Sequence, residues 1–196
     1  MPAEGIGRIA VFTGSAPGVD PAYAVAAAAF GRHLAEVGIG IVFGGARVGL
    51  MGSVADAALG AGGEVIGVMP KALVDKEIAH TGLTELITCD TMHERKAAMA
   101  DRADAFVALP GGAGTLEEIF EVWTWQQIGY HAKPVAFYDS AGYWQGLLTA
   151  LAEMATAGFM RQPYLDSLVV ESEPAALVSA LRTWSPPPET WMAPGS

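Results

Sequence analysis

The chain contains the stretch Ala105-Phe-Val-Ala-Leu-Pro-Gly-Gly-Ala-Gly-Thr-Leu-Glu-Glu118, in which an apolar run leads through a glycine-rich turn into a helical pattern. The apolar residues Ala105 to Leu109 predict a buried strand. Gly114 or Thr115 is expected to begin the next helix, because the glycines before it allow a sharp turn. A strand, turn and helix in this order are typical of an α/β fold that binds its ligand where the helix begins.

The same alternation of strand and helix runs through the rest of the chain. Further strands are expected at residues 9–13, 39–43, 64–68, 86–88, 134–138 and 168–170. Helices are expected at residues 20–37, 49–61, 92–103, 114–129, 143–157 and 174–184, and an irregular segment at 70–82. Asp20 followed by Pro21 predicts one helix start, and the capping box from Thr91 to Glu94 predicts another.

The expected strands are apolar throughout, which indicates a sheet that is covered on both faces. Strands that alternate with helices pair in parallel through right-handed crossovers. We therefore predict an α/β fold class: a single doubly wound, Rossmann-like domain with a mostly parallel sheet flanked by helices. It should span residues 1–184, followed by a proline-rich tail at 185–196 that is expected to be disordered.

Composition excludes several classes of protein. The chain has 196 residues, is 52% hydrophobic and carries a formal net charge of -10. The sequence shows no basic patch of the kind that nucleic-acid-binding proteins carry, so nucleic acid is not an expected partner. Cys89 is the single cysteine and is expected to be a small packing residue, which suits a cytoplasmic location. The histidines are scattered, so no metal site is expected. Neither a signal peptide nor a membrane-spanning segment is recognisable, so no membrane partner is expected.

The glycine-rich turn is the strongest candidate for a binding site. Its backbone amides and the dipole of the following helix could hold a phosphate, and the hydroxyl of Thr115 could add a donor. It is not a P-loop, because the Gly-Lys-Ser/Thr ending is absent. Two simpler interpretations stay open: a turn with no ligand, and a capping box in which Glu118 only bonds back to the helix start.

The charged residues around this turn suggest chemistry as well as binding. Glu117, Glu118 and Glu121 place several carboxylates beside an anion site, which is unhelpful unless a carboxylate meets a cationic transition state. Arg95 could grip phosphate or ribose oxygens and Lys96 could act as a point charge, although a solvated helical face would look the same. The glycines at 44–52 lack dinucleotide-fingerprint spacing, so they indicate a wall of a nucleotide pocket rather than an NAD site.

Taken together, the motifs resemble a known family. Residues 110–118 match the pattern PGGxGTxxE, and residues 92–96 read MHERK. With the glycines at 44–52, these motifs resemble the LOG ("lonely guy") family of cytokinin riboside 5'-monophosphate phosphoribohydrolases, whose members have often been called lysine decarboxylases. The similarity extends from about residue 7 to 159.

The resemblance implies an N-glycosyl hydrolase that acts on nucleoside 5'-monophosphates without a cofactor and forms a homodimer. It implies that Arg95 and Glu118 are the catalytic pair. The substrate-binding residues that it implies are Glu77, Met92, Lys96, Gly111, Gly112, Ala113, Gly114, Thr115, Leu116, Glu117 and Thr124. Residues that could form the pocket wall are Ser15, Gly44, Gly45 and Glu121. Trp123 and Trp125 are expected to pack in the core, the alternative being the dimer interface.

Two other functions remain open from the sequence. Molybdenum-cofactor carrier proteins have a similar fold and a glycine-rich anion site but perform no hydrolysis, so a non-catalytic carrier is the main alternative. Lysine decarboxylation would require pyridoxal phosphate on a lysine. No lysine stands in a recognisable anchoring pattern among the four present, which are Lys71, Lys76, Lys96 and Lys133.

Overall fold

The computed structural model describes residues 5–74 and 78–187. Its strands are β1 (Arg8–Phe12), β2 (Gly40–Phe43), β3 (Val65–Pro70), β4 (Glu85–Cys89), β5 (Ala105–Ala108), β6 (Val135–Tyr138) and β7 (Val169–Glu171). Its helices are α1 (Pro21–Glu36), α2 (Gly49–Gly60), α3 (Lys71–Val74), α4 (Met92–Asp101), α5 (Ala113–Gln127), the 3-10 turn η1 (Ser140–Gly142), α6 (Gln145–Thr156), α7 (Gln162–Asp166) and α8 (Pro174–Thr183).

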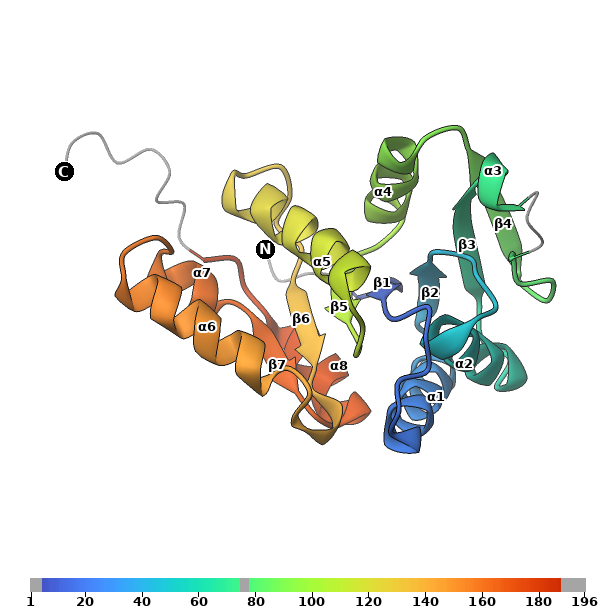
Figure 1. The fold of residues 1–196 in the computed structure, drawn as a ribbon, viewed down its shortest axis with the longest axis horizontal. Coiled ribbons are helices and arrows are strands. Elements are labelled where there is room, and N and C mark those ends of the chain that lie inside the picture. Colours follow the sequence, from blue (N-terminus) through green and yellow to red (C-terminus); the bar gives the residue numbers. More distant parts are fainter. Residues whose placement is uncertain (1–4, 75–77, 188–196) are drawn as a thin grey trace.

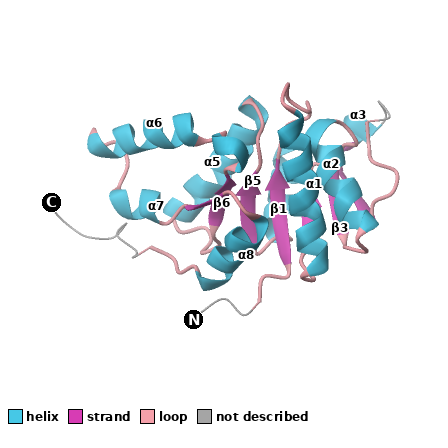
Figure 2. Cartoon of the chain, turned by 90° about the horizontal axis from the view of Figure 1, so that it is seen from below, coloured by secondary structure: helices cyan, strands magenta, loops and turns pink. Residues whose placement is uncertain are grey.

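All seven strands form one sheet in the order β4-β3-β2-β1-β5-β6-β7. Every neighbouring pair is parallel, and the strands of Figure 2 point the same way with helices on both faces. The chain builds outward from β1 to β4 and then returns to place β5 on the other side of β1 (Figure 1). The predicted doubly wound α/β domain is confirmed, and its topological switch point lies between β1 and β5.

Two hydrophobic layers hold this sheet, one on each face. Along β1, Ile9 and Val11 belong to the layer under α1, α2 and α8, whereas Ala10 and Phe12 belong to the layer under α4, α5 and α6. Successive side chains of a strand point to opposite faces, so both faces can be buried only if the strand is apolar throughout. The apolar runs of the sequence are thus explained by a sheet that is covered twice.

The predicted helix caps of α1 and α4 are confirmed. The Asp20 side chain accepts a hydrogen bond from the Ala22 amide, and the Thr91 hydroxyl accepts one from the Glu94 amide. In the usual capping box the glutamate accepts from the amide of the N-cap residue, which is Thr91 here. The Glu94 carboxylate instead accepts a hydrogen bond from the amide of Asp90, one residue earlier. Both helix starts therefore follow from local side-chain chemistry.

The structure corrects the expected start of α5. This helix begins at Ala113, with Gly112 as its cap and no side-chain capping bond. The capping box from Thr115 to Glu118 was wrong, because Thr115 already lies inside the helix. A glycine cap leaves the first amides of the helix without a side-chain acceptor, and Glu118 is available for another partner.

Several smaller elements also differ from the expectations. The helix expected at residues 143–157 starts only at Gln145, because η1 comes first and Ala141 takes a left-handed φ of 56°. The short helices α3 and α7 were not predicted: α3 lies in the segment expected to be irregular, and α7 has 5 residues. Helices this short form through tertiary packing rather than through a periodic pattern. The predicted tail is described only as far as residue 187.

Side-chain burial matches the expected packing roles. Trp123 is 1% exposed and Cys89 is buried in the same layer, so core packing is confirmed for both.

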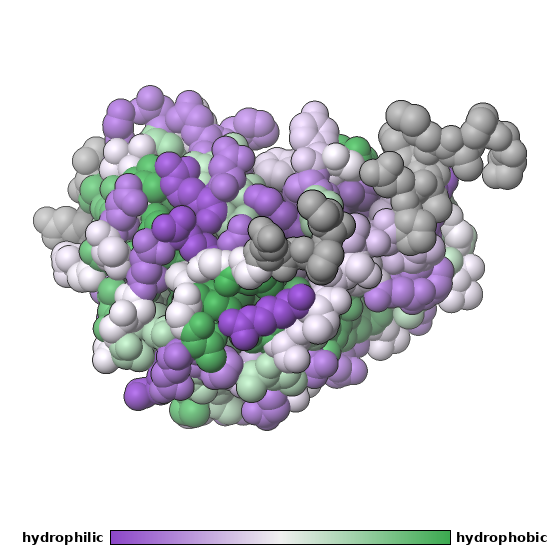
Figure 3. Space-filling view, turned by 180° about the vertical axis from the view of Figure 1, so that it is seen from behind, coloured by the Kyte–Doolittle hydropathy of each residue, from purple (hydrophilic) through white to green (hydrophobic). Residues whose placement is uncertain are grey.

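Across residues 5–74 and 78–187, no helix combines the length and the apolar character needed to cross a bilayer. The face turned away in Figure 1 shows hydrophilic residues with hydrophobic ones among them (Figure 3), as ordinary protein surfaces do.

Candidate active site

Three loops meet where β1, β2 and β5 end. The Gly14 amide after β1 donates to the Pro110 carbonyl after β5 at 3.0 Å. The Leu50 amide at the start of α2 donates to the Gly14 carbonyl at 3.1 Å. Gly49 has a φ of +56° and lies directly against the Ser15 backbone, so a side chain at this position would collide with that backbone. These contacts bring distant glycine-rich segments together at the switch point.

A pocket of about 310 Å³ opens at this junction. Its walls come from the loop after β1, the turn before α5, and single residues of α1, α2 and the segment after η1. The lining residues are Gly14, Ser15, Ala16, Pro17, Gly18, Tyr23, Leu50, Pro110, Gly111, Gly112 and Tyr143. The structure thus places Ser15, Gly111 and Gly112 of the predicted site in one pocket, at the position where open parallel sheets bind their ligands.

The N-terminus of α5 lies at the edge of this pocket. Ala113 and Gly114 are exposed in the first turn of the helix, and the first amides of a helix lack intrahelical acceptors. Together with the helix dipole, such amides favour an anion. Thr115 is 3% exposed and Leu116 packs against the core, so both contribute more to anchoring the turn than to its accessible surface.

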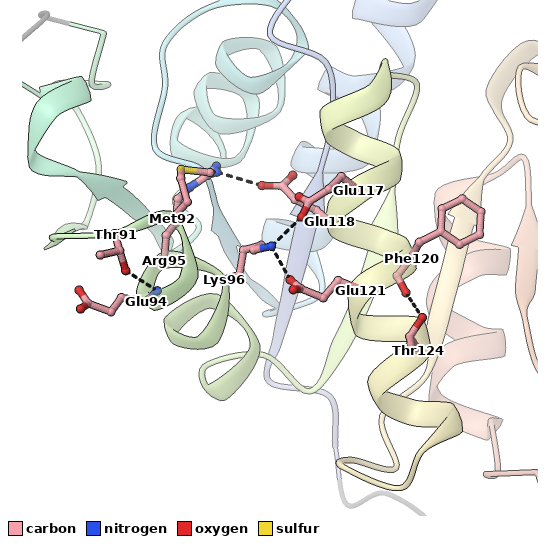
Figure 4. A network of polar contacts seen from close by, with 10 residues as sticks. All are labelled: Thr91, Met92, Glu94, Arg95, Lys96, Glu117, Glu118, Phe120, Glu121 and Thr124. Atoms are coloured by element: carbon pink, nitrogen blue, oxygen red, sulfur yellow. Dashed lines mark hydrogen bonds and ion pairs between the residues drawn. The ribbon is translucent and has the colours of Figure 1, made fainter.

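Arg95 of α4 and Glu118 of α5 form an ion pair, although neither side chain belongs to the lining of that pocket. Arg95 Nη1 lies 3.0 Å from Glu118 Oε1, and the two side chains are 11% and 12% exposed. Arg95 Nε also donates to the Val68 carbonyl of β3 at 3.1 Å, which fixes the plane of the guanidinium. Figure 4 shows the two side chains pointing toward one another from facing helices. The predicted catalytic pair is therefore assembled in space.

Burial changes the chemistry of the Glu118 carboxyl. Removal from water raises the pKa of Glu118 above the ordinary glutamate value, and the nearby Arg95 charge only partly counteracts this effect. Glu117 raises the same pKa, whereas Lys96 lowers it. A mostly buried carboxyl with a raised pKa and a single strong charge partner is the arrangement common at catalytic sites.

Lys96 forms ion pairs with the other two carboxylates of α5. Its Nζ lies 2.6 Å from Glu117 Oε1 and 2.9 Å from Glu121 Oε2, and the lysine side chain is 14% exposed (Figure 4). Hydrogen bonds to Glu117 and Glu121 raise the pKa of Lys96, so it remains charged. Two cations and three carboxylates thus lie close together, and the ionised cluster carries one net negative charge.

The remaining predicted residues occupy different places. Met92 is 48% exposed with its sulfur 4.0 Å from Arg95 Nη1, beside the ion pair. Gly44 packs against Arg95, whereas Gly45 has a φ of +80° and faces the side chains of β3 and β4. Thr124 is exposed, and its hydroxyl donates to the Phe120 carbonyl of its own helix at 2.7 Å. Glu77 lies outside the described residues.

Tyr143 is a pocket residue that the sequence motifs did not reveal. Its hydroxyl donates to the Gly111 carbonyl at 2.7 Å, across 32 positions of sequence. The expected helix at residues 143–157 placed this tyrosine at an ordinary helix start. Its true position depends on the turn with Ala141 in the left-handed region, which an alanine gives no reason to expect.

Comparison with known proteins identifies the family. A family model described as "Possible lysine decarboxylase" matches residues 51–181. A cytokinin riboside 5'-monophosphate phosphoribohydrolase of Rhodococcoides fascians is 43% identical over 176 residues, covering 89% of each chain. One from Arabidopsis thaliana is 44% identical over 180 residues, covering 91% of this chain and 82% of its own.

Solved structures agree with the observed fold. The molybdenum cofactor binding protein of Rippkaea orientalis has a TM-score of 0.69 at 20% identity, covering 92% of this chain and 98% of that one. At such low identity the likeness concerns the fold alone. Sequence identity above 40% over most of both chains decides the family: this chain belongs to the LOG family, the cytokinin riboside 5'-monophosphate phosphoribohydrolases.

Proposed function

We propose that the protein hydrolyses the N-glycosidic bond of nucleoside 5'-monophosphates with an adenine-type base, including N6-modified AMP and AMP itself. Water adds to C1' of the ribose while the bond from C1' to the base nitrogen breaks. The bonding electrons leave with the base, which gains a proton, and the products are free base and ribose 5-phosphate. The Arg95–Glu118 pair, mostly buried beside the start of α5, is the observation that carries this proposal.

Glu118 is the group suited to the cationic transition state. Cleavage of a glycosidic bond develops positive charge on the ribose, and a fixed carboxylate stabilises that charge and can orient the attacking water. Lys96 pairs with Glu117 and Glu121, so the net negative charge of the cluster resides on that group, beside the balanced pair of Glu118 and Arg95. Arg95 lowers the pKa that burial raises, which favours the ionised form of Glu118, and it offers further donors to the substrate.

The 5'-phosphate is expected at the glycine-rich turn. Gly111 and Gly112 line the pocket, and the first amides of α5 follow directly. Phosphate at a helix N-terminus gains both hydrogen bonds and a favourable dipole. Lys96 was also predicted to hold the phosphate; that remains a prediction, since its ammonium is paired with two carboxylates in this structure.

Base release is the direct test of this function. Purified protein is incubated with AMP, with isopentenyladenosine 5'-monophosphate and with the corresponding nucleosides, and free base is quantified by chromatography. We expect release from the monophosphates and much slower release from the nucleosides. Equal release from both would contradict a phosphate site, and absence of release from all four would contradict the hydrolase.

The pH dependence should report the buried carboxyl. Glu118 must be ionised to meet a cation, so kcat/KM should fall as pH decreases through the pKa of this group. Because burial raises that pKa, the decline should begin at a higher pH than for an ordinary glutamate. The profile of kcat/KM for AMP measures it; an acid limb at the ordinary glutamate pKa would contradict the assignment.

Gly44 provides a test of the Arg95 position that leaves every charged residue in place. A Cβ at Gly44 would collide with the Arg95 guanidinium and would approach Met51 Cε to 2.6 Å. We expect Gly44→Ala to displace Arg95 and to lower kcat/KM by roughly tenfold or more, since misplacement of about 1 Å is costly in catalysis.

The matched control is Gly146→Ala, because no atom lies within 4 Å of a Cβ added in the first turn of α6. That variant should retain the activity of the unmodified protein. Unchanged activity in Gly44→Ala as well would show that the guanidinium position seen here is unimportant for turnover.

We also propose that the protein acts in the cytoplasm as a homodimer, in line with what the resemblance implies. Sedimentation of the purified protein over a range of concentrations tests the second point. A species of monomer mass at all concentrations would contradict it.

A further inference from the structure

Tyr143 connects the segment after β6 to the glycine-rich turn after β5. Its hydroxyl donates to the Gly111 carbonyl at 2.7 Å, and both residues line the pocket. The tyrosine is 38% exposed, so its ring is partly open to the pocket and to solvent. Among the described residues, no charged side chain lines this pocket, which makes the tyrosine hydroxyls and Ser15 its polar side-chain groups.

The ring of Tyr143 is held from two sides. Tyr23 of α1 meets it edge-on with ring centroids 5.4 Å apart, and Trp144 does so at 4.7 Å. Trp144 is in turn fixed by its amide, which donates to the Asp139 carboxylate at 2.6 Å. The turn reaches this arrangement with Ala141 in a left-handed conformation, at φ 56°, which an alanine rarely adopts. The hydroxyl is therefore placed by packing on several elements.

The hydrogen bond to Gly111 determines the direction of a peptide in the anion site. A peptide bond is planar and trans, so its carbonyl and the following amide point in opposite directions. Holding the Gly111 carbonyl thus fixes the Gly112 amide, which glycines alone would leave free to rotate. The Tyr143 hydroxyl also donates a hydrogen bond to the Gly111 carbonyl oxygen, whose partial negative charge would otherwise repel an anion bound nearby.

We infer that Tyr143 is a positioning residue that sets the glycine-rich turn for the phosphate group of the substrate. The inference rests on the proposed function for the identity of the substrate. It assigns Tyr143 to binding of the phosphate rather than to cleavage of the glycosidic bond, because its contact is with the turn and not with the Arg95–Glu118 pair.

The test is Tyr143→Phe, which keeps the ring contacts and removes only the hydroxyl. Loss of one hydrogen bond should raise the KM for AMP by about three- to tenfold and leave kcat unchanged. The Kd for ribose 5-phosphate, measured by calorimetry, should rise by the same factor. Base release from adenosine, which has no phosphate, should not change relative to the unmodified protein.

Tyr164→Phe is the matched control. Tyr164 likewise donates its hydroxyl to a backbone carbonyl, that of Gln127 at 3.1 Å, but does not line the pocket. Both variants should lower Tm to a similar extent, and Tyr143→Phe alone should change the KM. Equal KM and Kd values in the two variants, or a matching loss with adenosine, would overturn the inference.

The calorimetric measurement separates this inference from the proposed function. If the unmodified protein releases no base but binds ribose 5-phosphate, the hydrolase proposal fails while the comparison of Kd values still decides the role of Tyr143. If base is released but Tyr143→Phe alters neither constant, the hydrolase stands and the positioning role is wrong.

Discussion

Glu118→Gln is expected to lower kcat for base release from AMP by a factor on the order of a hundred or more, with little change in KM. The amide has the size of the carboxylate but carries no charge, so the ribose cation loses its main stabilising group. The Arg95 contact can persist through the amide oxygen, which should preserve the local structure. Initial rates at saturating AMP measure the change, and circular dichroism checks the fold.

The control for this variant is Glu153→Gln. Glu153 is an exposed glutamate of α6, and the same change there should leave kcat unaltered. Near-normal turnover by Glu118→Gln would eliminate the proposed catalytic role and would favour the simpler interpretation in which the Arg95 contact is structural only.

Arg95→Met should have an effect of similar size with a different signature. Without this cation the pKa of Glu118 should rise further, because Arg95 is the main group that lowers it and only Lys96 remains to oppose the effect of burial. We expect kcat/KM at neutral pH to fall on the order of a hundredfold, as it does when a positioned charge is lost. The acid limb of the pH profile should also move to higher pH, which is measured by comparing profiles with the unmodified protein.

Arg102→Met is the matched control, because Arg102 is an exposed arginine at the end of the same helix and its guanidinium donates to the Ala98 carbonyl one turn earlier. Its pH profile should coincide with that of the unmodified protein. An Arg95→Met enzyme that is slow but has an unmoved acid limb would show that Arg95 does not control the ionisation of Glu118.

The fold could be predicted from the sequence because its signals are local. Apolar strands that alternate with helices predict a parallel sheet with two covered faces, and Asp20 and Thr91 mark helix starts through their own side chains. Helix ends and short helices were less predictable. The segment with Ala141 adopts its turn because Asp139 and Trp144 hold it, and these contacts follow from the fold rather than from a turn motif.

Part of the candidate site could also be predicted from local sequence signals. Glu118 and Arg95 stand in recognisable motifs, and the sheet topology brings those motifs together. The competition for Glu118 between a capping box and an ion pair could not be decided from spacing, since the answer depends on whether the helix begins at Ala113 or Thr115. Tyr143 has no motif at all, because its role depends on a contact across the pocket.

Hydrolysis at C1' of the ribose is tested by identifying both products of the reaction. AMP is incubated with the protein in water enriched in oxygen-18, and the products are analysed by mass spectrometry. We expect adenine and ribose 5-phosphate in equal amounts, with the heavy oxygen in the sugar phosphate at C1. Adenosine with labelled inorganic phosphate, or recovery of intact AMP alone, would contradict it.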